Sequence, residues 1–326
     1  KIRVSKSGIH QLTDAVIKRA GFSSLDKVKI YGYGGALQNE KLVGEELEAL
    51  DDLKEVPTCT VDGRRLFYAQ GPVTWNSSDV RVRNPYSDYG YYFITQSDET
   101  PLSVSAEEFL AENYPKADDY NSLHEIDNYA WFRGGRNLYE NTPINLGSDK
   151  TYTIARKGAS DKGKMKVVLT AGCNSTAEVS VNDSVIGTFI ITLGTYDAGN
   201  YAEKTFDVYG LKDENSVKIT PKSGGPFRLD YISLHTDQPA PAPSLSSASF
   251  PQAEYVYNIT NQNHHADRNI DMVIIVPTSG ILHTQAQRLK TFHEQHDSMT
   301  VKVVPADELY NEFSSGTPDA NAYRRY

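Results

Sequence analysis

The feature that most constrains how this chain can fold is a short, strongly hydrophobic run near its C-terminal end, Asn269–Pro277. It is rich in β-branched residues and ends at a proline, which predicts a strand at Ile270–Val276 that is buried on both faces. An amphipathic helix is predicted next, over 279–296, with Ser279 as a candidate N-cap. Thr300–Val304 predicts a second buried strand, stopped by Pro305. This order predicts a βαβ unit with parallel strands and a right-handed crossover.

A single βαβ unit cannot form a stable parallel sheet, because such sheets need more strands and a cover on both faces. The sequence ends at Tyr326, soon after the second strand. We therefore expect an incomplete α/β domain, of which the remainder is missing. Ile270–Val276 and Val301–Val304 should be poorly buried or covered by a neighbouring molecule, and a sheet of five or more strands would contradict this expectation.

Residues 1–123 predict a small α+β leader region. Asp62–Gly63 is a strong hairpin signal between two strands. A helix over 105–114 is indicated by Ser105 and Glu108, which have the spacing of a capping box. Short strands are also predicted at 2–4, 27–31 and 90–95, and a short helix at 13–20, whereas 71–90 is loop-like.

From residue 124 to 238 the pattern is almost wholly that of short strands separated by turns. The predicted strands are 125–132, 151–155, 164–170, 177–181, 185–191, 203–208, 216–220 and 228–236. Strands at this spacing, with no long helix among them, favour a β-sandwich or jelly roll. Residues 239–269 form a Pro-rich linker and a tether, in which 254–257 is a candidate edge strand. The predicted fold class is therefore mostly β, followed by the incomplete βαβ unit at 270–326.

Composition excludes some classes of function. The 33 basic and 42 acidic residues give a net charge of −9, and no run of Lys or Arg occurs, which argues against nucleic acid binding. No stretch is long and apolar enough to predict a transmembrane segment. The 21 tyrosines and the turn-rich composition are typical of an extracellular β protein. The first residue is Lys1 rather than Met, which is consistent with a mature or trimmed N-terminus.

Neither of the two cysteines, Cys59 and Cys173, has the surroundings of a catalytic nucleophile. We expect a structural or incidental role for both, as free thiols or as one disulfide bond. The pair His293 and His296 has i, i+3 rather than i, i+4 spacing, and is expected to lie on a solvated helix end. His264–His265 is expected to lie in a polar, solvated loop.

Two further patterns are weak indications of a binding site. Gly32–Gly35 follows a predicted strand but lacks the third glycine and the helix of a dinucleotide site, so that a β-turn is favoured. Asp51–Asp52, Asp118–Asp119 and the loop Asn76–Asp88 contain oxygen ligands that suit calcium, although none forms a defined calcium loop. From its own residues the chain predicts no catalytic, cofactor-binding or metal site.

Several segments, in the right order along the chain, resemble the gingipain-type cysteine peptidases, and most closely their subgroup of type IX secretion sortases. In the C-terminal part these segments are Asp271–Val276, Gln287–Lys290, Val301–Val304, Asp307–Gly316 and Pro318–Asp319. In the β-rich part they are Ile2–Ile9, Val28–Gly35, Asn84–Ser87, Tyr91–Thr95 and Leu229–Ile232. The resemblance implies a surface cysteine endopeptidase that removes the C-terminal sorting signals of secreted cargo.

The same resemblance implies partners and a location: cargo proteins with C-terminal sorting domains, outer-membrane secretion components, and the cell surface. The family's catalytic His and Cys belong to downstream motifs that this sequence does not contain, and neither Cys59 nor Cys173 matches the nucleophile position. The chain is therefore expected to be an N-terminal portion that lacks the catalytic residues and supports the docking of cargo or partners. Two alternatives remain, a non-catalytic carbohydrate- or protein-binding β-sandwich at 125–236, and an intact enzyme that uses Cys173.

Overall fold

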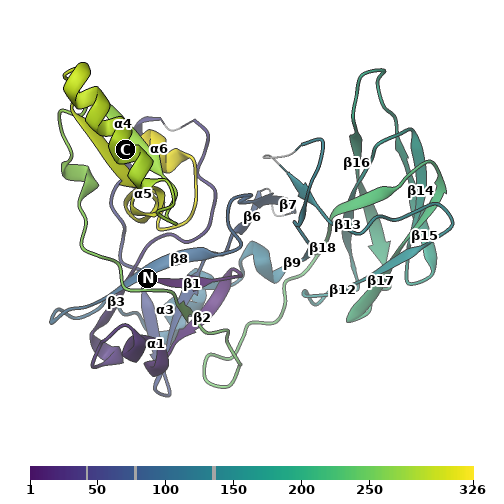
Figure 1. Cartoon of the computed structure of the whole chain (residues 1–326). Coiled ribbons are helices and arrows are strands. Elements are labelled where there is room, and N and C mark those ends of the chain that lie inside the picture. Colours follow the sequence, from purple (N-terminus) through teal and green to yellow (C-terminus); the bar gives the residue numbers. More distant parts are fainter. Residues whose placement is uncertain (42, 77–78, 134–136) are drawn as a thin grey trace. The chain divides into compact units, whose positions relative to one another are not determined.

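The computed structural model describes residues 1–41, 43–76, 79–133 and 137–326 (Figure 1). The chain divides into two compact units. Unit 1 contains residues 1–74, 82–113 and 244–326, and unit 2 contains residues 75–81 and 114–243. β6 (Val73–Asn76) and β7 (Val80–Arg83) form a two-stranded sheet. The sequence predicts this region as a loop, so the two strands are a correction.

Unit 1 contains a four-stranded sheet in the order β19–β1–β8–β3. Its strands are β19 (Glu254–Tyr255), β1 (Ile2–Val4), β8 (Gly90–Gln96) and β3 (Val28–Tyr31). β1 is an inner strand, because Ile2 pairs with Tyr92 on one side and with Tyr255 on the other. The predicted edge strand in the tether is therefore confirmed as β19.

A second sheet of unit 1 contains the predicted hairpin. Its strands, in the order β2–β5–β4, are β2 (Gly8–Leu12), β5 (Arg64–Ala69) and β4 (Thr58–Val61). Asp62 and Gly63 connect β4 and β5 with φ values of 50° and 75°, the positive angles that a two-residue hairpin turn of this type requires. The hairpin prediction is confirmed.

Three short helices accompany these sheets: α1 (Asp14–Arg19), α2 (Gly44–Ala49) and α3 (Ala106–Asn113). A 3-10 turn, η1 (Leu25–Lys27), precedes β3. The capping box of α3 is present, since Glu108 N donates to Ser105 Oγ at 3.2 Å and Ser105 N donates to Glu108 Oε2 at 3.0 Å. α2 was not predicted, because its acidic sequence carries no apolar periodicity.

The C-terminal part of unit 1 contains the predicted βαβ unit. β20 (Met272–Val276) and β21 (Val301–Pro305) pair in parallel, and α4 (His283–His296) connects them. α5 (Ala306–Phe313) and α6 (Asn321–Arg325) follow. The helix begins later than predicted, with Leu282 at its N-cap position, so that Ser279 does not cap it.

β20 is not buried on both faces as its composition predicts. Val273 and Ile275 are each 38% exposed, whereas Val276, Val301 and Val304 are buried. In the described part of the chain β20 and β21 form a sheet of two strands. The expected poor burial therefore holds for one face of β20 but not for β21, which packs against α4 and α5 and whose Val304 lies in a cluster with Leu309, Phe313 and Ala322. Of the apolar positions on α4, Ala286 is buried and Leu289 and Phe292 are exposed.

Unit 2 is a β-sandwich of two four-stranded antiparallel sheets, as the strand pattern predicts. One sheet has the order β12 (Lys150–Ala155), β17 (Glu214–Ser223), β14 (Ser175–Val181) and β15 (Ser184–Ile191). The other has the order β16 (Asn200–Tyr209), β13 (Lys162–Ala171), β18 (Phe227–Thr236) and β9 (Asn121–Glu125). Alternate residues of both sheets fill the core between them, among them Val167, Leu169, Phe189, Ile219 and Phe227.

One predicted strand of unit 2 is wrong. The segment 125–132 is not continuous: β9 ends at Glu125, and Tyr129–Ala130 forms a separate short strand, β10, that pairs with β11 (Leu138–Tyr139). Asp127 lies between the two strands, so that the chain leaves the sheet there and turns over its outer face. A short 3-10 turn, η2 (Ala117–Asp119), precedes β9.

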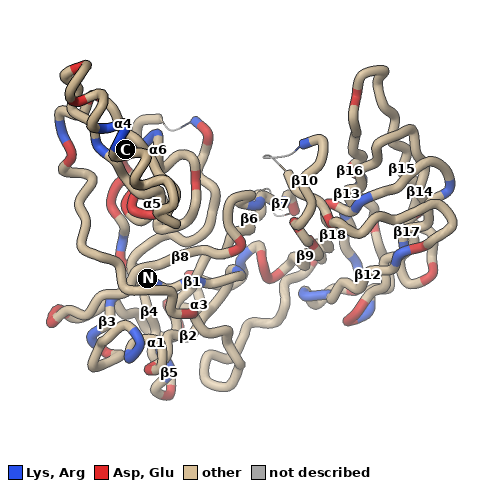
Figure 2. The backbone as a smooth tube through the Cα atoms, viewed as in Figure 1, with Lys and Arg blue, Asp and Glu red and all other residues tan. Residues whose placement is uncertain are grey.

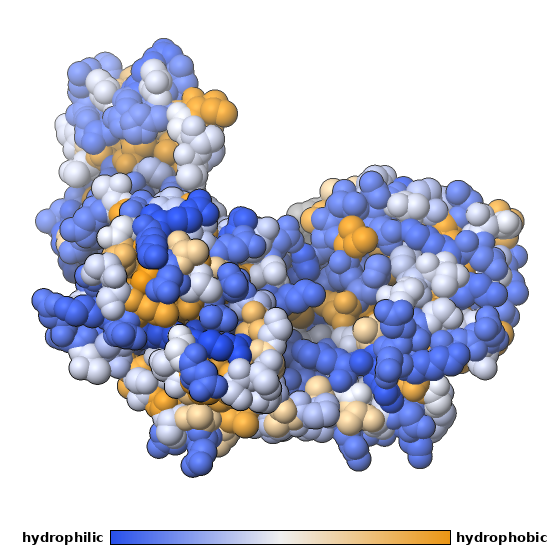
Figure 3. Space-filling view, turned by 90° about the horizontal axis from the view of Figure 1, so that it is seen from below, coloured by the Kyte–Doolittle hydropathy of each residue, from blue (hydrophilic) through white to orange (hydrophobic). Residues whose placement is uncertain are grey.

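The surface carries charges of both signs. Figure 2 shows Lys and Arg interspersed with Asp and Glu along the chain, with acidic residues on α5. The face seen in Figure 3 is mostly hydrophilic, and its hydrophobic residues form small separate patches. Among the described residues, no helix has the length and apolar character needed to cross a membrane.

Candidate binding site

Unit 2 has a cavity of about 790 Å³ over one face of its second sheet. The residues that line it combine aromatic rings with charges of both signs. They are Val80, Arg81, Phe132, Arg133, Asn137, Tyr139, Lys166, Val168, Tyr201, Glu203, Asp230 and Tyr231. Cavities of this size with a few polar groups are the usual form of small-ligand sites.

The register of the sheet builds the floor of this cavity. Val168 on β13 pairs with Glu203 on β16 and with Tyr231 on β18, and Tyr231 pairs in turn with Glu125 on β9. Directly paired residues point to the same face of a sheet, so these four side chains form one row on the face away from the core.

A β-bulge adds Asp230 to this row. On β18 the pairing with β13 shifts from Tyr231 opposite Val168 to Leu229 opposite Leu169, so that Asp230 has no partner residue. A bulge inserts one residue and redirects its side chain. Asp230 and Tyr231 consequently both line the cavity, although they are consecutive in sequence.

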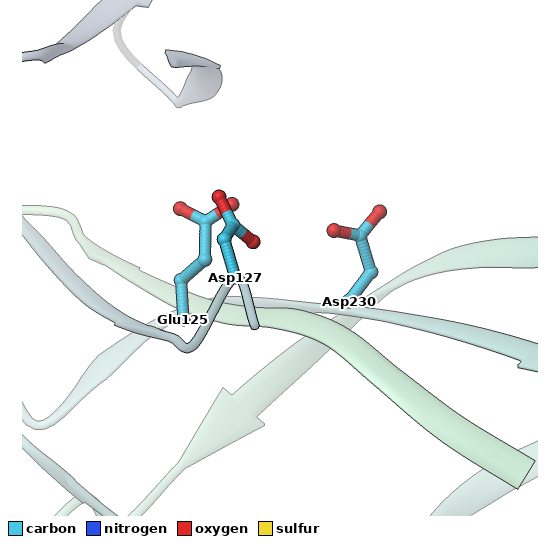
Figure 4. Close-up of side chains that lie close together, drawn as sticks. All are labelled: Glu125, Asp127 and Asp230. Carbon is cyan, nitrogen blue, oxygen red and sulfur yellow. The ribbon is translucent and has the colours of Figure 1, made fainter. Parts of the chain in front are cut away.

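Three carboxylates lie together beside the cavity (Figure 4). One ligand atom from each of Glu125, Asp127 and Asp230 lies within 4.8 Å of the others, and the close-up shows all three side chains on the same side of the ribbon. This spacing would suit a cation. However, the Arg81 guanidinium forms an ion pair with Glu125, and a fixed positive charge opposes a metal ion at the same place. The cluster is better explained as an ion-paired wall than as a metal centre.

Asp230 is the most buried of the three, with only 5% of its surface exposed. Its Oδ2 accepts a hydrogen bond from Asn137 Nδ2 at 2.8 Å, whereas its Oδ1 has no hydrogen-bond partner among the described residues. Burial raises the pKa of this carboxyl to about 6, against the opposing charge of Arg81. Unit 2 therefore holds a buried acceptor oxygen at the cavity wall.

Replacement of Asp230 by asparagine should reduce the loss of stability that unit 2 undergoes as the pH rises from about 4 to about 8. A carboxyl whose pKa is raised in the folded state destabilises that state as pH rises from the unfolded pKa of about 4 through 6. We expect Asp230→Asn to raise the free energy of unfolding by about 2 kcal/mol at about pH 8 and to change it little at about pH 4. Denaturant unfolding followed by tryptophan fluorescence measures this, because Trp75 and Trp131, the two tryptophans of the chain, both belong to unit 2. An equal change at both pH values would contradict the assignment.

The structure shows both cysteines as free thiols. Cys59 is 1% exposed in β4 and packs in a hydrophobic cluster, where burial raises the pKa of its thiol. Cys173 is exposed, and its Sγ lies 3.4 Å from Ser175 Oγ and 3.3 Å from Gly225 O. Within the described part of the chain, neither thiol has a histidine at hydrogen-bond distance.

The expectation of a solvated loop is wrong for His264. This residue belongs to η3 (His264–Ala266), is 8% exposed, and is held on both ring nitrogens. Its Nδ1 lies 2.9 Å from Asp267 and its Nε2 lies 2.8 Å from Glu308 on α5. By contrast, His293 contacts Asp297 at the exposed end of α4, as expected.

Two acidic residues connect this segment to the helices and strand that follow it. Glu312 on α5 accepts hydrogen bonds from Gln262 Nε2 at 2.7 Å, from His264 N at 2.7 Å and from His265 Nδ1 at 2.8 Å. Asp267 is bonded by Lys302 on β21, by the Tyr326 hydroxyl and by His264. The sequence gives no sign of these contacts, since the partners are far apart along the chain.

The other weak candidates have structural partners. Asp118 accepts from Trp75 Nε1 at 3.2 Å, and Asp119 from Lys116 N at 2.7 Å. In the loop 76–88, residues 77 and 78 lie outside the described residues. The glycines at 32–35 form a turn, as expected, and Gly34 has a φ of 78° and no room for a Cβ atom, which would clash with Gln70 O. That these places hold no metal site stays a prediction, with calcium as the alternative.

Comparisons with known proteins bear on this fold. Residues 265–326 match the family described as Peptidase family C25. No protein with a curated description matches the chain. Among solved structures, dimeric latent PorU from Porphyromonas gingivalis aligns with 99% of this chain at a TM-score of 0.76 and 24% identity, and the alignment covers 38% of PorU. The chain thus spans well under half the length of that protein.

Two carbohydrate-binding modules give weaker matches. A family 35 module from an environmental isolate covers 38% of this chain, with 93% of its own length, at 20% identity and a TM-score of 0.27. A module of Cellvibrio mixtus lichenase 5A in complex with cellotriose covers 37%, with 94% of its own length, at 14% identity and a TM-score of 0.25. These likenesses are too weak to support an argument. The resemblance to gingipain-type peptidases is confirmed by residues 265–326, which carry the sequence pattern of peptidase family C25, on a chain that shares the fold of PorU over 99% of its length.

Proposed function

We propose that this chain is part of a gingipain-like sortase, a cysteine endopeptidase that processes the C-terminal sorting signals of proteins secreted by the type IX system. The observation that carries the proposal is the match of residues 265–326 to peptidase family C25 on a chain with the fold of PorU. We further propose that the described chain does not cleave peptide bonds itself and instead docks cargo or outer-membrane secretion components at the cell surface.

The surroundings of the two thiols support the second part of this proposal. Thiolate catalysis needs a base within hydrogen-bond reach and an exposed sulfur. Cys59 is buried and Cys173, although exposed, has Ser175 and a backbone carbonyl as its neighbours. Neither arrangement supplies a general base.

Docking is tested by the capture of the full chain on an immobilised C-terminal sorting domain of a type IX cargo protein. The expected result is retention on the sorting domain and none on the same cargo without it. Equal retention on both surfaces would show non-specific adhesion, and no retention on either would overturn the docking role.

Catalysis is tested separately, with a peptide that spans a sorting-signal junction. We expect no cleavage above background by the chain, and the same result for Cys173→Ala. Cleavage that disappears in Cys173→Ala would establish Cys173 as a nucleophile and overturn the non-catalytic assignment. Ser175→Ala is a suitable control, because it removes a neighbour of Cys173 but no thiol.

A second candidate function, a carbohydrate- or protein-binding β-sandwich, is favoured by one specific observation. Unit 2 has a cavity of about 790 Å³ whose wall combines four aromatic rings with charged side chains. A docking role for the chain and a ligand site in unit 2 are separate proposals, and each has its own test.

A further inference from the structure

Among the described residues that line the cavity of unit 2, Arg133 is a cation that no carboxylate neutralises. Arg81 pairs with Glu125, and Lys166 Nζ lies 3.0 Å from Glu203 Oε1. Arg133 instead rests against aromatic rings, with its guanidinium 4.3 Å from the ring centroid of Tyr201. Within the part of the chain that the structure describes, Arg133 has no acidic partner. An anionic group that enters the cavity would therefore find its natural partner in Arg133.

The cavity wall also contains a buried hydrogen-bond acceptor, the carboxylate of Asp230. Asp230 is only 5% exposed, and its Oδ1 accepts no hydrogen bond from the part of the chain that the structure describes. A buried acceptor without a partner is costly and is uncommon in folded proteins. Because Asp230 lines the cavity, a ligand that donates a hydrogen bond, such as a hydroxyl, would satisfy this oxygen.

Aromatic side chains form the apolar part of the wall. Phe132 and Tyr139 are stacked with an interplanar angle of 15° and centroids 5.8 Å apart, and Tyr201 lies beside Arg133. Gly199 makes room for this group, because a Cβ atom there would lie 2.9 Å from Phe132 Cδ1. Flat aromatic faces bury the apolar face of a sugar ring while the hydroxyls at the ring edge remain free to form hydrogen bonds.

The position of the cavity on a sheet favours a sugar over a peptide. Extended peptides usually bind by adding a strand to a free sheet edge. Here the floor is the face of inner strands β13 and β18, whose backbone groups are already paired on both sides. At this floor a ligand is therefore recognised through side chains, which suits a molecule rich in hydroxyl groups.

We propose that the cavity of unit 2 binds a hexuronate, a pyranose sugar that carries one carboxylate. The carboxylate lies against the Arg133 guanidinium, a ring hydroxyl donates to Asp230 Oδ1, and one ring face packs on Tyr201. A single negative charge fits better than a phosphate dianion, because one guanidinium pairs with one carboxylate. Arg81 and Lys166 already form ion pairs with Glu125 and Glu203. This inference rests on the second candidate function and specifies its ligand.

The test uses the full chain and two sugars, methyl glucuronide and its methyl ester, in which esterification removes the negative charge and adds one methyl group. Binding is followed by the fluorescence of Trp131, whose ring lies next to Phe132 at a centroid distance of 5.0 Å, and by calorimetry. We expect the uronate to bind at least about tenfold more tightly than the ester. Arg133→Ala should remove that difference, and Asp230→Asn should weaken both sugars. Arg156→Ala is the matched control, because Arg156 pairs with Asp213 and does not line the cavity.

The outcomes separate the inference from the function on which it rests. Binding of both sugars with equal affinity would overturn the hexuronate assignment and leave a carbohydrate site in place. If the chain bound neither sugar but captured a peptide that ends in a free carboxylate, the hexuronate assignment and the carbohydrate-binding function would both be overturned. The cavity would then be a peptide site. Loss of the charge preference in Arg156→Ala as well as in Arg133→Ala would show that net charge, rather than the cavity, selects the anion.

Discussion

Phe227→Ala should lower the free energy of unfolding of unit 2 by about 3–5 kcal/mol. Phe227 is fully buried at the start of β18 and belongs to the sandwich core. Its backbone also pairs with Ile144, with N–O distances of 2.9 and 2.8 Å in the two directions. Truncation to alanine loses the transfer free energy of the ring and leaves a cavity that a core between two sheets cannot close.

Denaturant unfolding followed by tryptophan fluorescence isolates this effect, because both tryptophans belong to unit 2. Tyr209→Ala is the matched control: it removes an aromatic ring from β16 that is 72% exposed, and should change the free energy by less than about 0.5 kcal/mol. Phe227→Leu should lower the free energy of unfolding by about 1–1.5 kcal/mol, which lies between the effects of Phe227→Ala and Tyr209→Ala. If Phe227→Ala and Tyr209→Ala had similar effects, Phe227 would not be part of the core.

Asp267→Ala should release the segment around η3 from the C-terminal helices and β21. Asp267 receives hydrogen bonds from Lys302, His264 and the Tyr326 hydroxyl, and its side chain is 17% exposed. Its removal leaves these three donors without a partner, which should lower the local stability by about 3 kcal/mol. Hydrogen exchange read by mass spectrometry over 262–326 should show faster exchange than in the wild type. Asp98→Ala, which removes an exposed ion pair with Lys27, should leave exchange in that region unchanged.

The same residue predicts a loss of stability in acid. Burial raises the pKa of Asp267, but the hydrogen bonds from Lys302, His264 and Tyr326 outweigh it and lower the pKa to about 2. A carboxyl with a depressed pKa stabilises the folded state above its unfolded pKa of about 4, and this contribution is lost as pH falls towards 2. The wild type should therefore lose about 2 kcal/mol over that range, after allowance for the water that reaches the site, whereas Asp267→Ala should lose less. Parallel pH profiles for the two proteins would exclude Asp267 as the source.

The elements that follow from local sequence could be predicted. The Asp62–Gly63 hairpin needs positive φ at two consecutive residues, and these two residues supply it. The capping box at Ser105 and Glu108 is likewise local. The parallel pairing of β20 and β21 follows from chain order alone, because a helical crossover returns the second strand in the same direction.

The candidate site could not be predicted, because its residues meet only through strand pairing. Glu125 and Asp230 come close because β9 pairs with β18, and no short-range pattern specifies that register. The side chain of Asp230 faces the cavity because of a bulge, which changes the alternation that a strand pattern assumes. The prediction of a solvated loop is wrong for His264 for a similar reason, because the carboxylate of Glu308 that binds its ring belongs to a separate helix.

The pairing of β1 with β19 has a consequence for how the chain folds during synthesis. Ile2 lies between Tyr92 and Tyr255, so the first sheet of unit 1 cannot be completed until residues beyond 250 have left the ribosome. Residues 114–243 of unit 2 emerge before that point and contain both sheets of the sandwich. Since domains fold as their residues emerge, and closure of a long loop costs entropy, unit 2 should fold while the sheet of unit 1 still lacks its last strand. The sandwich would then fold first and shorten the effective loop that β1 and β19 have to close.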